Sequence, residues 1–526
     1  MNETPLLLPS LRNATVFVAC AGIMGAGIAQ VAALAGHPVR LFDLRAGAAA
    51  AAKAKLAGTF DGLVAKGRMD AVAAQGALAR IEPVDSTAAA QGAGLVVEAI
   101  VEQLEAKRAL FTELEGVVDV RCVLATNTSS ISVTAIANGL RNSGRVVGMH
   151  FFNPVPLMKL VEVVSGLQTD PAVAAAIASL ARHWGKVPVL AKSTPGFIVN
   201  RIARSYYAET LALLLEQAAT PAVIDACLRG AGFRMGPCEL MDLIGHDTNF
   251  AVTRSVFDAN FQDKRFVPSL LQAEMVAGGL LGRKSGRGFY TYRNGQPDDA
   301  ALPVTVTKAP AIAREVTVHG VGAIAHHLES ATTAALAAQG WGPARLTDSR
   351  WTGLEIDGAR LVLTDGRTAT ELASVQGRAD IAVFDRPVAL AAAGFLKPAP
   401  SPGTALAFAV AHGCPTAWPG QAAAWLAALG FAPLPVADVP GLVVARTVAM
   451  LLNEAADAVQ QGVCDEAGAD AAMKLGVNHP AGPFEFLARW RVPEVVALLD
   501  TLDFHYRGDR YRVSPWLRSR GHRTGA

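Results

Sequence analysis

The stretch VFVACAGIMGAGIAQ, residues 16–30, joins a short apolar run to a glycine-rich turn and a helical pattern. The run ATVFVA at 14–19 is apolar and rich in β-branched residues, which is typical of a buried strand. From Met24 to Ala35 the pattern is helical, and Gly36 stands where a helix C-cap belongs. The stretch therefore predicts a strand–turn–helix unit of the kind that begins a parallel α/β sheet.

The turn keeps two of the three glycines of the pattern G-x-G-x-x-G, with Cys20 at the first position and Gly22 and Gly25 at the others. Gly22 lets the backbone approach a pyrophosphate, Gly25 lets the helix pack closely on the strand, and the helix N-terminus offers free N–H groups. We expect a dinucleotide to bind across residues Gly22, Ile23, Met24 and Gly25. A glycine turn without a ligand is the alternative. If the turn needs a backbone angle that glycine favours, the Cβ of Cys20 adds roughly 1–3 kcal/mol of conformational strain. If the backbone angle is an ordinary one, cysteine fits there as a small apolar side chain.

Further apolar runs end in polar or small residues: PVRLFD (38–43), LVVEAIVE (95–102), RCVLATNTSS (121–130) and RVVGMHFFNP (145–154). Strands that alternate with helical segments predict a mostly parallel, doubly wound sheet. Ligands of such sheets bind at the carboxyl ends of the strands. The polar residues at these ends are therefore expected to share one crevice, and they are Asp43, Glu102, Asn127, Ser129 and His150.

Two of these strand-end residues indicate a particular chemistry. The Asp43 carboxylate can accept hydrogen bonds from a ribose diol, which favours NAD over NADP, although Arg45 could instead bind a 2′-phosphate. His150 is suited to take the proton of an alcohol because the ordinary pKa of histidine lies near working pH. Glu162 could hold its ring, and Ser129 and Asn200 could hydrogen-bond the substrate. A histidine bonded to a nearby carbonyl and a buried structural glutamate are the alternatives.

The second half of the chain repeats the first. PGFIVNR (195–201) returns as PGLVVAR (440–446), and after one inserted residue GPCEL (236–240) returns as GPFEF (482–486). Between the copies, VTVHGVGAIA (316–325) predicts a degenerate strand–turn–helix unit, and residues 197–285 are predicted to be helical. We expect a Rossmann-type domain, a helical domain, a degenerate Rossmann-like domain and a second helical domain, at 1–192, 193–300, 301–435 and 436–526.

Composition excludes several classes of protein. The 526 residues carry a net charge of +2, which gives no electrostatic case for nucleic acid or a membrane surface. The six cysteines are scattered without a C-x-x-C pair, so we expect reduced thiols, no metal and a cytoplasmic location. Residues 1–13 lack a long apolar run and do not resemble a signal peptide, and we expect no membrane span.

The first 290 or so residues resemble the L-3-hydroxyacyl-CoA dehydrogenases of β-oxidation, in the strings VVEAIVE, NTSS, HFFNPVPLMKLVEVV, KSTPGFIVNR and GRKSGRGFY. The resemblance implies NAD-dependent oxidation with His150 as the base, Glu162 as its partner, and Ser129 and Asn200 as hydrogen-bonding groups. It implies a set of NAD contacts: Asp43, Glu102, Lys107, Asn127 and Lys284. It also places Asn153 near the acyl-CoA and a helical hairpin at about 48–70 over the CoA. The basic residues of that hairpin could meet the CoA phosphates, although such side chains are usually only solvated: Lys53, Lys55, Lys66 and Arg68.

The duplicated tail resembles the longer bacterial members, including 3-hydroxyadipyl-CoA dehydrogenases of phenylacetate breakdown and 3-hydroxybutyryl-CoA dehydrogenases. Another hydroxyacid dehydrogenase on the same fold, for example an aromatic or lambda-crystallin-like one, and a non-catalytic scaffold stay open as alternatives. The second half has Ala445 in the place of Asn200 and no string like NTSS or HFFNP, which predicts one active site per chain. The resemblance implies that shorter members dimerise through the helical domain. We therefore expect either a monomer that is an internal pseudo-dimer or a homodimer.

Overall fold

The computed structural model describes residues 11–298, 302, 313–337, 340–388 and 403–524. These residues divide into two compact units: residues 1–201 with 461–477, and residues 202–460 with 478–526. The expected domain boundaries remain predictions, and the one at 300/301 lies outside the described residues. So does most of the N-terminal segment discussed above.

The first unit contains an eight-stranded sheet in the order β3-β2-β1-β4-β5-β6-β7-β8. Its strands are β1 (Val16–Ala19), β2 (Val39–Phe42), β3 (Ile81–Val84), β4 (Leu95–Glu98), β5 (Val123–Thr126), β6 (Val146–Phe151), β7 (Leu160–Ser165) and β8 (Val187–Lys192). All neighbours are parallel except β6 and β7, which pair antiparallel. The predicted Rossmann-type sheet is confirmed, and the antiparallel pair brings His150 directly opposite Glu162.

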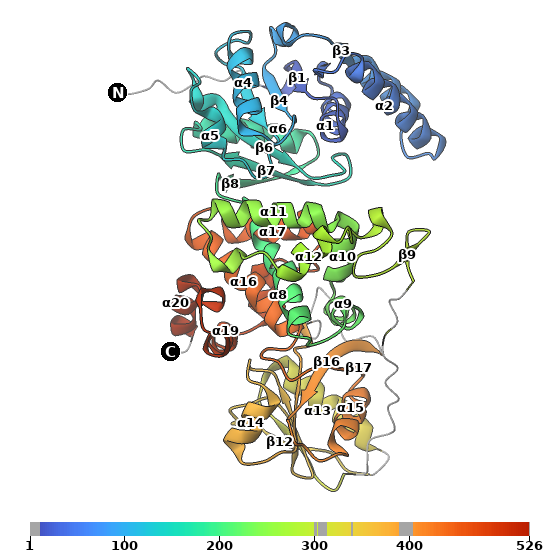
Figure 1. The fold of residues 1–526 in the computed structure, drawn as a ribbon, viewed down its shortest axis with the longest axis vertical. Coiled ribbons are helices and arrows are strands. Elements are labelled where there is room, and N and C mark those ends of the chain that lie inside the picture. The colour runs from blue at the N-terminus through green and yellow to red at the C-terminus, as the bar shows by residue number, and fades with distance from the viewer. Residues whose placement is uncertain (1–10, 299–301, 303–312, 338–339, 389–402, 525–526) are drawn as a thin grey trace. The chain divides into compact units, whose positions relative to one another are not determined.

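Helices cover this sheet because its strands are apolar on both faces (Figure 1). The first-unit helices are α1 (Ile23–Leu34), α2 (Ala48–Ala65), α3 (Ala71–Arg80), α4 (Leu104–Glu115), α5 (Val133–Ala137) and α6 (Pro171–His183). Val16 and Val18 pack in one core with Ile28 of α1 and Ile177 of α6. Phe17 lies between them in sequence and points to the opposite face, as the period of two along a strand requires. The segment α7 (Val199–Ile202) follows β8.

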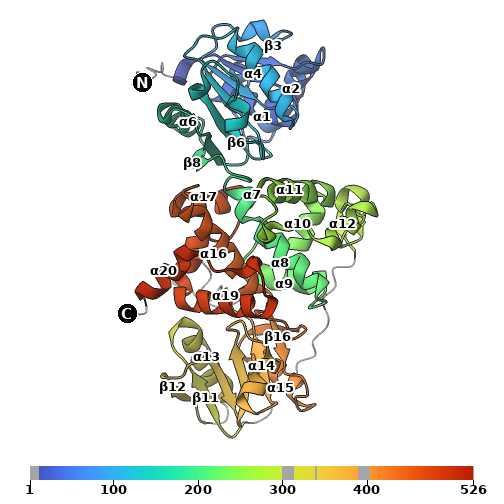
Figure 2. The same ribbon diagram turned by 60° about the vertical axis from the view of Figure 1, so that its left-hand side comes forward.

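The second unit holds two sets of helices from the two halves of the chain. The first set is α8 (Arg204–Leu215), α9 (Pro221–Gly230), α10 (Pro237–Ile244), α11 (His246–Ala259) and α12 (Leu270–Ala277), followed by the short strands β9 (Tyr292–Arg293) and β10 (Gln296–Pro297). The second set is α16 (Val444–Gln460), α18 (Pro483–Arg489), α19 (Val492–Tyr506) and α20 (Pro515–Thr524). The long helices α8 and α16 pack against each other, so the two sets form one helical body (Figure 2).

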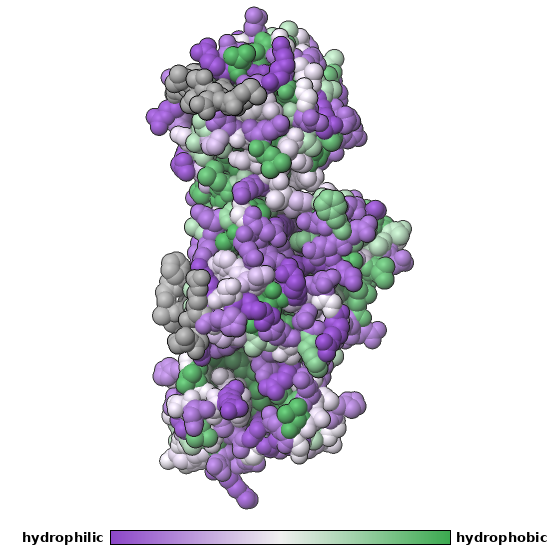
Figure 3. Space-filling view, turned by 90° about the vertical axis from the view of Figure 1, so that its left-hand side faces the viewer, coloured by the Kyte–Doolittle hydropathy of each residue, from purple (hydrophilic) through white to green (hydrophobic). Residues whose placement is uncertain are grey.

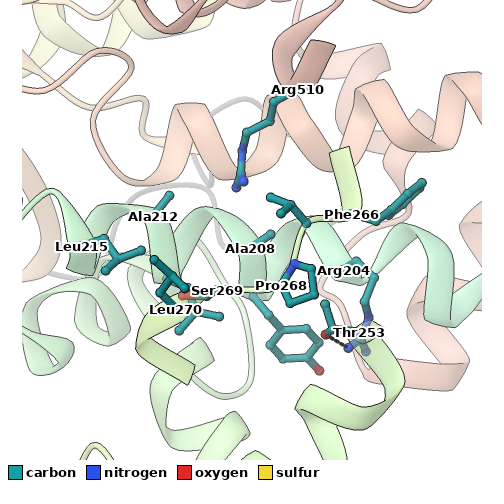
Figure 4. A pocket seen from close by; sticks show the side chains of 13 residues that line it. Arg204, Ala208, Ala212, Leu215, Thr253, Phe266, Pro268, Ser269, Leu270 and Arg510 are labelled. Atoms are coloured by element: carbon teal, nitrogen blue, oxygen red, sulfur yellow. Dashed lines mark hydrogen bonds between the residues drawn. The ribbon is translucent and has the colours of Figure 1, made fainter. Parts of the chain in front are cut away.

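Charged residues are buried where these two sets meet. Glu209 of α8 is fully buried and accepts hydrogen bonds from Arg446 (2.7 Å), Arg510 (2.9 Å) and Tyr511 (2.9 Å), all from the second half. Arg510 also borders a cavity of about 160 Å³ beside α8, shown in Figure 4. Because buried charges are stable only when paired, these contacts bind the two halves together.

A seven-stranded sheet completes the second unit, in the order β12-β11-β13-β14-β15-β16-β17. Its strands are β11 (Val316–His319), β12 (Ala344–Leu346), β13 (Gly353–Ile356), β14 (Ala359–Leu363), β15 (Ile381–Phe384), β16 (Thr404–Val410) and β17 (Phe431–Pro435), and its helices are α13 (Gly322–Leu336), α14 (Ala369–Gln376) and α15 (Trp418–Ala428). The predicted degenerate α/β unit is confirmed. The hairpin β13–β14 was not predicted, and it adds antiparallel pairs to a sheet in which β15 and β16 also pair antiparallel.

One helix from each half packs on the sheet of the other half. Helix α17 (Glu466–Val477) lies in the first unit against β7 and β8, and α9 packs on β16 in the second unit. The N–H of Lys192 donates to the carbonyl of Val463 (2.9 Å), and the N–H of Ala437 donates to that of Ala218 (2.8 Å). Both pairs are related by the 245-residue repeat of the sequence. The exchange is therefore reciprocal, as it is between the subunits of a two-fold dimer.

The surface in Figure 3 is covered mainly by hydrophilic side chains with small hydrophobic groups between them. Among the described residues, no helix combines the length and apolar character needed to cross a membrane.

Candidate active site

His150 of β6 and Glu162 of β7 form a buried pair. The Nδ1 atom of His150 lies 2.6 Å from Oε2 of Glu162. The other carboxylate oxygen, Oε1, accepts the N–H groups of Ile198 (3.1 Å) and Val199 (3.0 Å). With Nδ1 as the ring nitrogen that donates its N–H to Oε2, Glu162 accepts hydrogen bonds at both of its oxygens. This leaves Nε2 as the basic nitrogen of the ring.

Glu102 organises the loop after β5. It accepts hydrogen bonds from the Thr128 hydroxyl (2.6 Å) and from the N–H groups of Ser129 (2.9 Å) and Ser130 (3.1 Å). Lys107 is buried, 3.2 Å from Glu102, and also pairs with Glu98. Burial opposes the charge of Glu102, but the Lys107 ammonium and these hydrogen bonds outweigh it and lower the pKa of Glu102.

Lys107 is held by carboxylates of the protein. Its side chain is only 1 % exposed and lies between Glu98 and Glu102, and its expected contact with NAD stays a prediction. Asn127 is similarly tied to the protein, because its Oδ1 atom accepts the N–H of Phe151 (2.8 Å), next to His150. Both residues hold neighbouring strand ends in place. The sequence did not predict these structural contacts, because they join segments that are distant in the chain.

The glycine turn is strained at Cys20. Its φ angle is +114°, in the region that side chains rarely adopt. The equivalent turn of the second sheet has Gly320 at this position, with φ of +90°. The Cys20 thiol accepts the N–H of Gly22 (3.3 Å), one of the groups expected to face a pyrophosphate. Gly25 has no alternative, because a Cβ there would lie 1.8 Å from the carbonyl oxygen of Cys20.

A cavity of about 580 Å³ opens between Cys20, the end of β2 and the start of α4. Asp43 and Arg45 line it with mostly apolar neighbours, including Val101. Asp43 accepts hydrogen bonds from the N–H of Ala21 (2.9 Å) and from Arg45 (3.1 Å). Burial opposes its charge, yet these hydrogen bonds lower the pKa of Asp43 to about 2. An apolar pocket with a carboxylate at its edge fits an adenosine with a free 2′-hydroxyl.

A second cavity of about 370 Å³ lies between α1, α2 and the loop after β6. It brings together Ile23, Lys55 and Asn153. Lys66 and Arg68 are exposed beyond the end of α2, and they do not line this cavity.

The remaining expected residues lie as follows. Met24 packs partly against the sheet core, Ser129 and Asn200 are partly exposed, and Lys53 is half-buried on α2. Lys284 lies in the second unit, where it pairs with Asp247.

The second sheet has no equivalent of the histidine–glutamate pair. By strand register, Asp385 stands where the first sheet has His150, and Ala407 stands where it has Glu162. Asp385 accepts the N–H groups of Val443 (3.0 Å) and Val444 (2.6 Å), the repeats of the two residues that bind Glu162. A carboxylate on the neighbouring strand thus binds the start of the repeated helix, and there is no histidine beside it in this register.

Comparison with known proteins agrees with this architecture. Residues 15–194 match the 3-hydroxyacyl-CoA dehydrogenase NAD binding domain, and residues 196–292 and 441–523 match the C-terminal domain of the same enzymes. Residues 361–440 match the 3-hydroxybutyryl-CoA dehydrogenase reduced Rossmann-fold domain.

Individual relatives extend the match over the whole chain. The chain is 43% identical over 507 residues to a 3-hydroxyadipyl-CoA dehydrogenase of Escherichia coli K12, covering 96% of this chain and 97% of that protein. A shorter relative, a probable 3-hydroxybutyryl-CoA dehydrogenase of Bacillus subtilis, is 38% identical and covers 53% of this chain and 96% of its own length. The crystal structure of a 3-hydroxybutyryl-CoA dehydrogenase from Escherichia coli K12 superposes with a TM-score of 0.84 at 42% identity, covering 98% of this chain and 99% of that one. These matches favour neither another hydroxyacid dehydrogenase nor a scaffold, and the chain belongs to the 3-hydroxyacyl-CoA dehydrogenase family.

Proposed function

We propose that this NAD-dependent dehydrogenase oxidises L-3-hydroxyacyl-CoA thioesters to 3-oxoacyl-CoA, reversibly, with His150 as the general base. The observation that carries the proposal is the 2.6 Å contact between His150 and Glu162, at the carboxyl end of β6. An alcohol loses a proton and a hydride when it is oxidised, so the enzyme needs a base beside the reacting carbon.

The chain's own residues handle the proton and the substrate oxygen. Nε2 of His150 accepts the hydroxyl proton, and Glu162 stabilises the imidazolium that results. Ser129 and Asn200 hydrogen-bond the substrate oxygen. The hydride acceptor for the carbon that bears the hydroxyl group would be supplied by bound NAD.

The first unit suits NAD in three respects. The N-terminus of α1 has no side-chain cap at Gly22, so the N–H groups of its first turn are available to a pyrophosphate, whereas the N–H of Gly22 itself is bonded to the Cys20 thiol. The 580 Å³ cavity suits the adenosine, with Asp43 on its ribose. Glu102 and Asn127 stand at the neighbouring strand ends, and the expected contact of Lys284 with NAD stays a prediction.

We assign the cavity beside α2 to the CoA portion, with Asn153 near the thioester and Lys55 near the phosphates. The expected contact of Lys66, which lies outside this cavity, stays a prediction. The names of the two Escherichia coli relatives suggest short acyl chains, with or without a distal carboxylate.

The test is a coupled assay of NADH oxidation with acetoacetyl-CoA and 3-oxoadipyl-CoA. Turnover of either thioester supports the proposal, and the ratio of their kcat/KM values identifies the preferred acyl group. The matched control is free acetoacetate, which lacks CoA. Turnover of the free acid alone would indicate a different hydroxyacid dehydrogenase, and binding of NADH without any turnover would indicate a scaffold.

A further inference from the structure

Helix α17 comes from the half of the chain that lacks the histidine–glutamate pair, yet it lies on the strands that carry Glu162. Its contacts are close. A Cβ added to Gly476 would lie 2.8 Å from a methyl group of Leu160 and 2.9 Å from one of Val199. Leu160 begins the strand of Glu162, and Val199 donates its N–H to Glu162. The space that Gly476 leaves is therefore filled by the two segments that hold the carboxylate.

Other contacts of the same segment converge on Glu162. A Cβ on Gly468 would lie 2.7 Å from the carboxylate of Asp465 in its own segment and 2.9 Å from Val189, which is the β8 residue in register with Glu162. The carbonyl of Val463 accepts the N–H of Lys192, at the end of β8. Burial raises the pKa of the Cys464 thiol to about 12, and the nearby carboxyl groups of Asp465 and Glu162 act in the same direction.

We propose that helix α17 is a positioning element for the catalytic pair. It holds β7 against the start of α7, so that Glu162 keeps its two backbone hydrogen bonds and its hydrogen bond to His150. The inference rests on the proposed role of that pair. It gives the second half a part in the reaction although its own sheet carries Asp385 and Ala407 in place of the pair.

The repeat supplies a matched control. Gly230 is the last residue of α9, and Gly476 lies near the end of α17, the repeat of α9. A Cβ on Gly230 would lie 2.7 Å from the carbonyl oxygen of Ala405, which is the repeat of Leu160. Gly230→Ala therefore crowds the corresponding contact at least as severely, but beside the sheet that lacks the pair. Any general loss of packing affects both variants, whereas displacement of Glu162 affects only Gly476→Ala.

The experiment compares Gly476→Ala and Gly230→Ala in the full-length chain. We expect both to lower Tm, and only Gly476→Ala to lower kcat, by about 10-fold, with the KM for NAD unchanged. Proton NMR gives a second readout, because the Nδ1 proton of His150 in its 2.6 Å contact should resonate far downfield and shift or broaden in Gly476→Ala alone. Equal kcat values in the two variants, or a wild-type kcat and an unchanged resonance in Gly476→Ala, would overturn the proposal.

Two further variants keep the outcome decisive. If Gly476→Ala does not fold, Gly468→Ala tests the same clamp through Val189, and a wild-type kcat in that folded variant overturns the proposal. His150→Ala tests the pair itself: wild-type turnover there refutes the proposed base, which is a different failure from that of the clamp.

Discussion

The proposed roles of His150 and Glu162 can be tested by one substitution at each residue. His150→Ala should lower kcat by about 10²–10⁴-fold and leave the Kd for NAD unchanged, because it removes only the proton acceptor. Glu162→Gln should lower kcat within the same range for a different reason. If the amide oxygen keeps the two N–H donors at Ile198 and Val199, the amide nitrogen faces His150 and moves the ring proton to Nε2. Steady-state kinetics and calorimetry of NAD binding measure both effects, and wild-type turnover in either variant would remove the proposed pair.

Cys20 is predicted to weaken the binding of NAD. Its positive φ angle stores roughly 1–3 kcal/mol of strain, and its thiol occupies the N–H of Gly22. Cys20→Gly removes both, so we expect NAD to bind up to about 10-fold more tightly. Cys20→Ala is the matched control, since it frees the N–H but keeps the strain. Calorimetric titration of the three proteins separates the two contributions, and weaker binding to the glycine variant would mean that the thiol itself contacts NAD.

For single residues, the sequence predicted which side chains take part in the site better than it predicted their backbone angles and hydrogen-bond partners. The glycine turn, Asp43 and the pairing of His150 with Glu162 all follow from chemistry and spacing. The sign of φ at Cys20 could not be predicted, because a small side chain fits either conformation and only the backbone decides. The N–H groups of Ile198 and Val199 were not predicted as donors to Glu162, because nearly every residue has a backbone N–H and residue type does not show which of them binds a distant side chain.

At the element scale, the structure reveals a role for the residue after strand β15 (Ile381–Phe384) that the sequence did not predict. Burial raises the pKa of Asp385 to about 6, although four backbone N–H groups stabilise its charge. In the unfolded chain its pKa is about 3.9. As the pH rises from 4 to 6 the unfolded chain loses this proton first, so the contribution of Asp385 to stability decreases across that window, by up to about 3 kcal/mol.

Asp385→Asn tests this directly because asparagine does not titrate. The variant should be less stable than the wild type, since the amide nitrogen cannot accept an N–H. The difference in the free energy of unfolding between the wild type and the variant should be largest near pH 4 and decrease as the pH approaches 6. Urea denaturation of both proteins at each pH measures this difference. A deficit that grows over this window would mean that the folded carboxyl has a lowered pKa instead.

The exchange of α9 and α17 between the halves was beyond prediction from the sequence. The repeat indicated two related helical domains, and the apolar pattern of the tail predicted that it packs on something. Which helix packs on which sheet depends on contacts hundreds of residues apart, for which one sequence holds no signal. The structure shows α8 packed on α16 within one chain, as the pseudo-dimer hypothesis requires, while the number of chains per molecule stays a prediction.

At the scale of the whole molecule, we predict one bound NAD per chain. The second sheet carries Asp385 and Ala407 where the first has His150 and Glu162, and the second half has no string like NTSS or HFFNP. Calorimetry with the full chain should give a stoichiometry near one, and a value near two would show that the second sheet binds the cofactor.

Truncation after residue 298 tests whether the second half replaces a second subunit. The fragment loses α16, and Glu209 loses Arg446, Arg510 and Tyr511. A buried carboxylate left without its partners costs about 3–5 kcal/mol, so the fragment should aggregate or dimerise, whereas the full chain should sediment as a monomer.

Dimerisation of the fragment has a further consequence for its activity. The partner's α9 is the repeat of α17, so a dimer built like the full chain would return a helix to β7 and β8. The specific activity of the fragment should therefore rise with its concentration, in step with the fraction of dimer seen by sedimentation velocity. The full chain is the control, with an activity independent of concentration. A fragment that stays a soluble, fully active monomer would show that neither α16 nor α17 is needed, and would contradict both the pseudo-dimer and the clamp on Glu162.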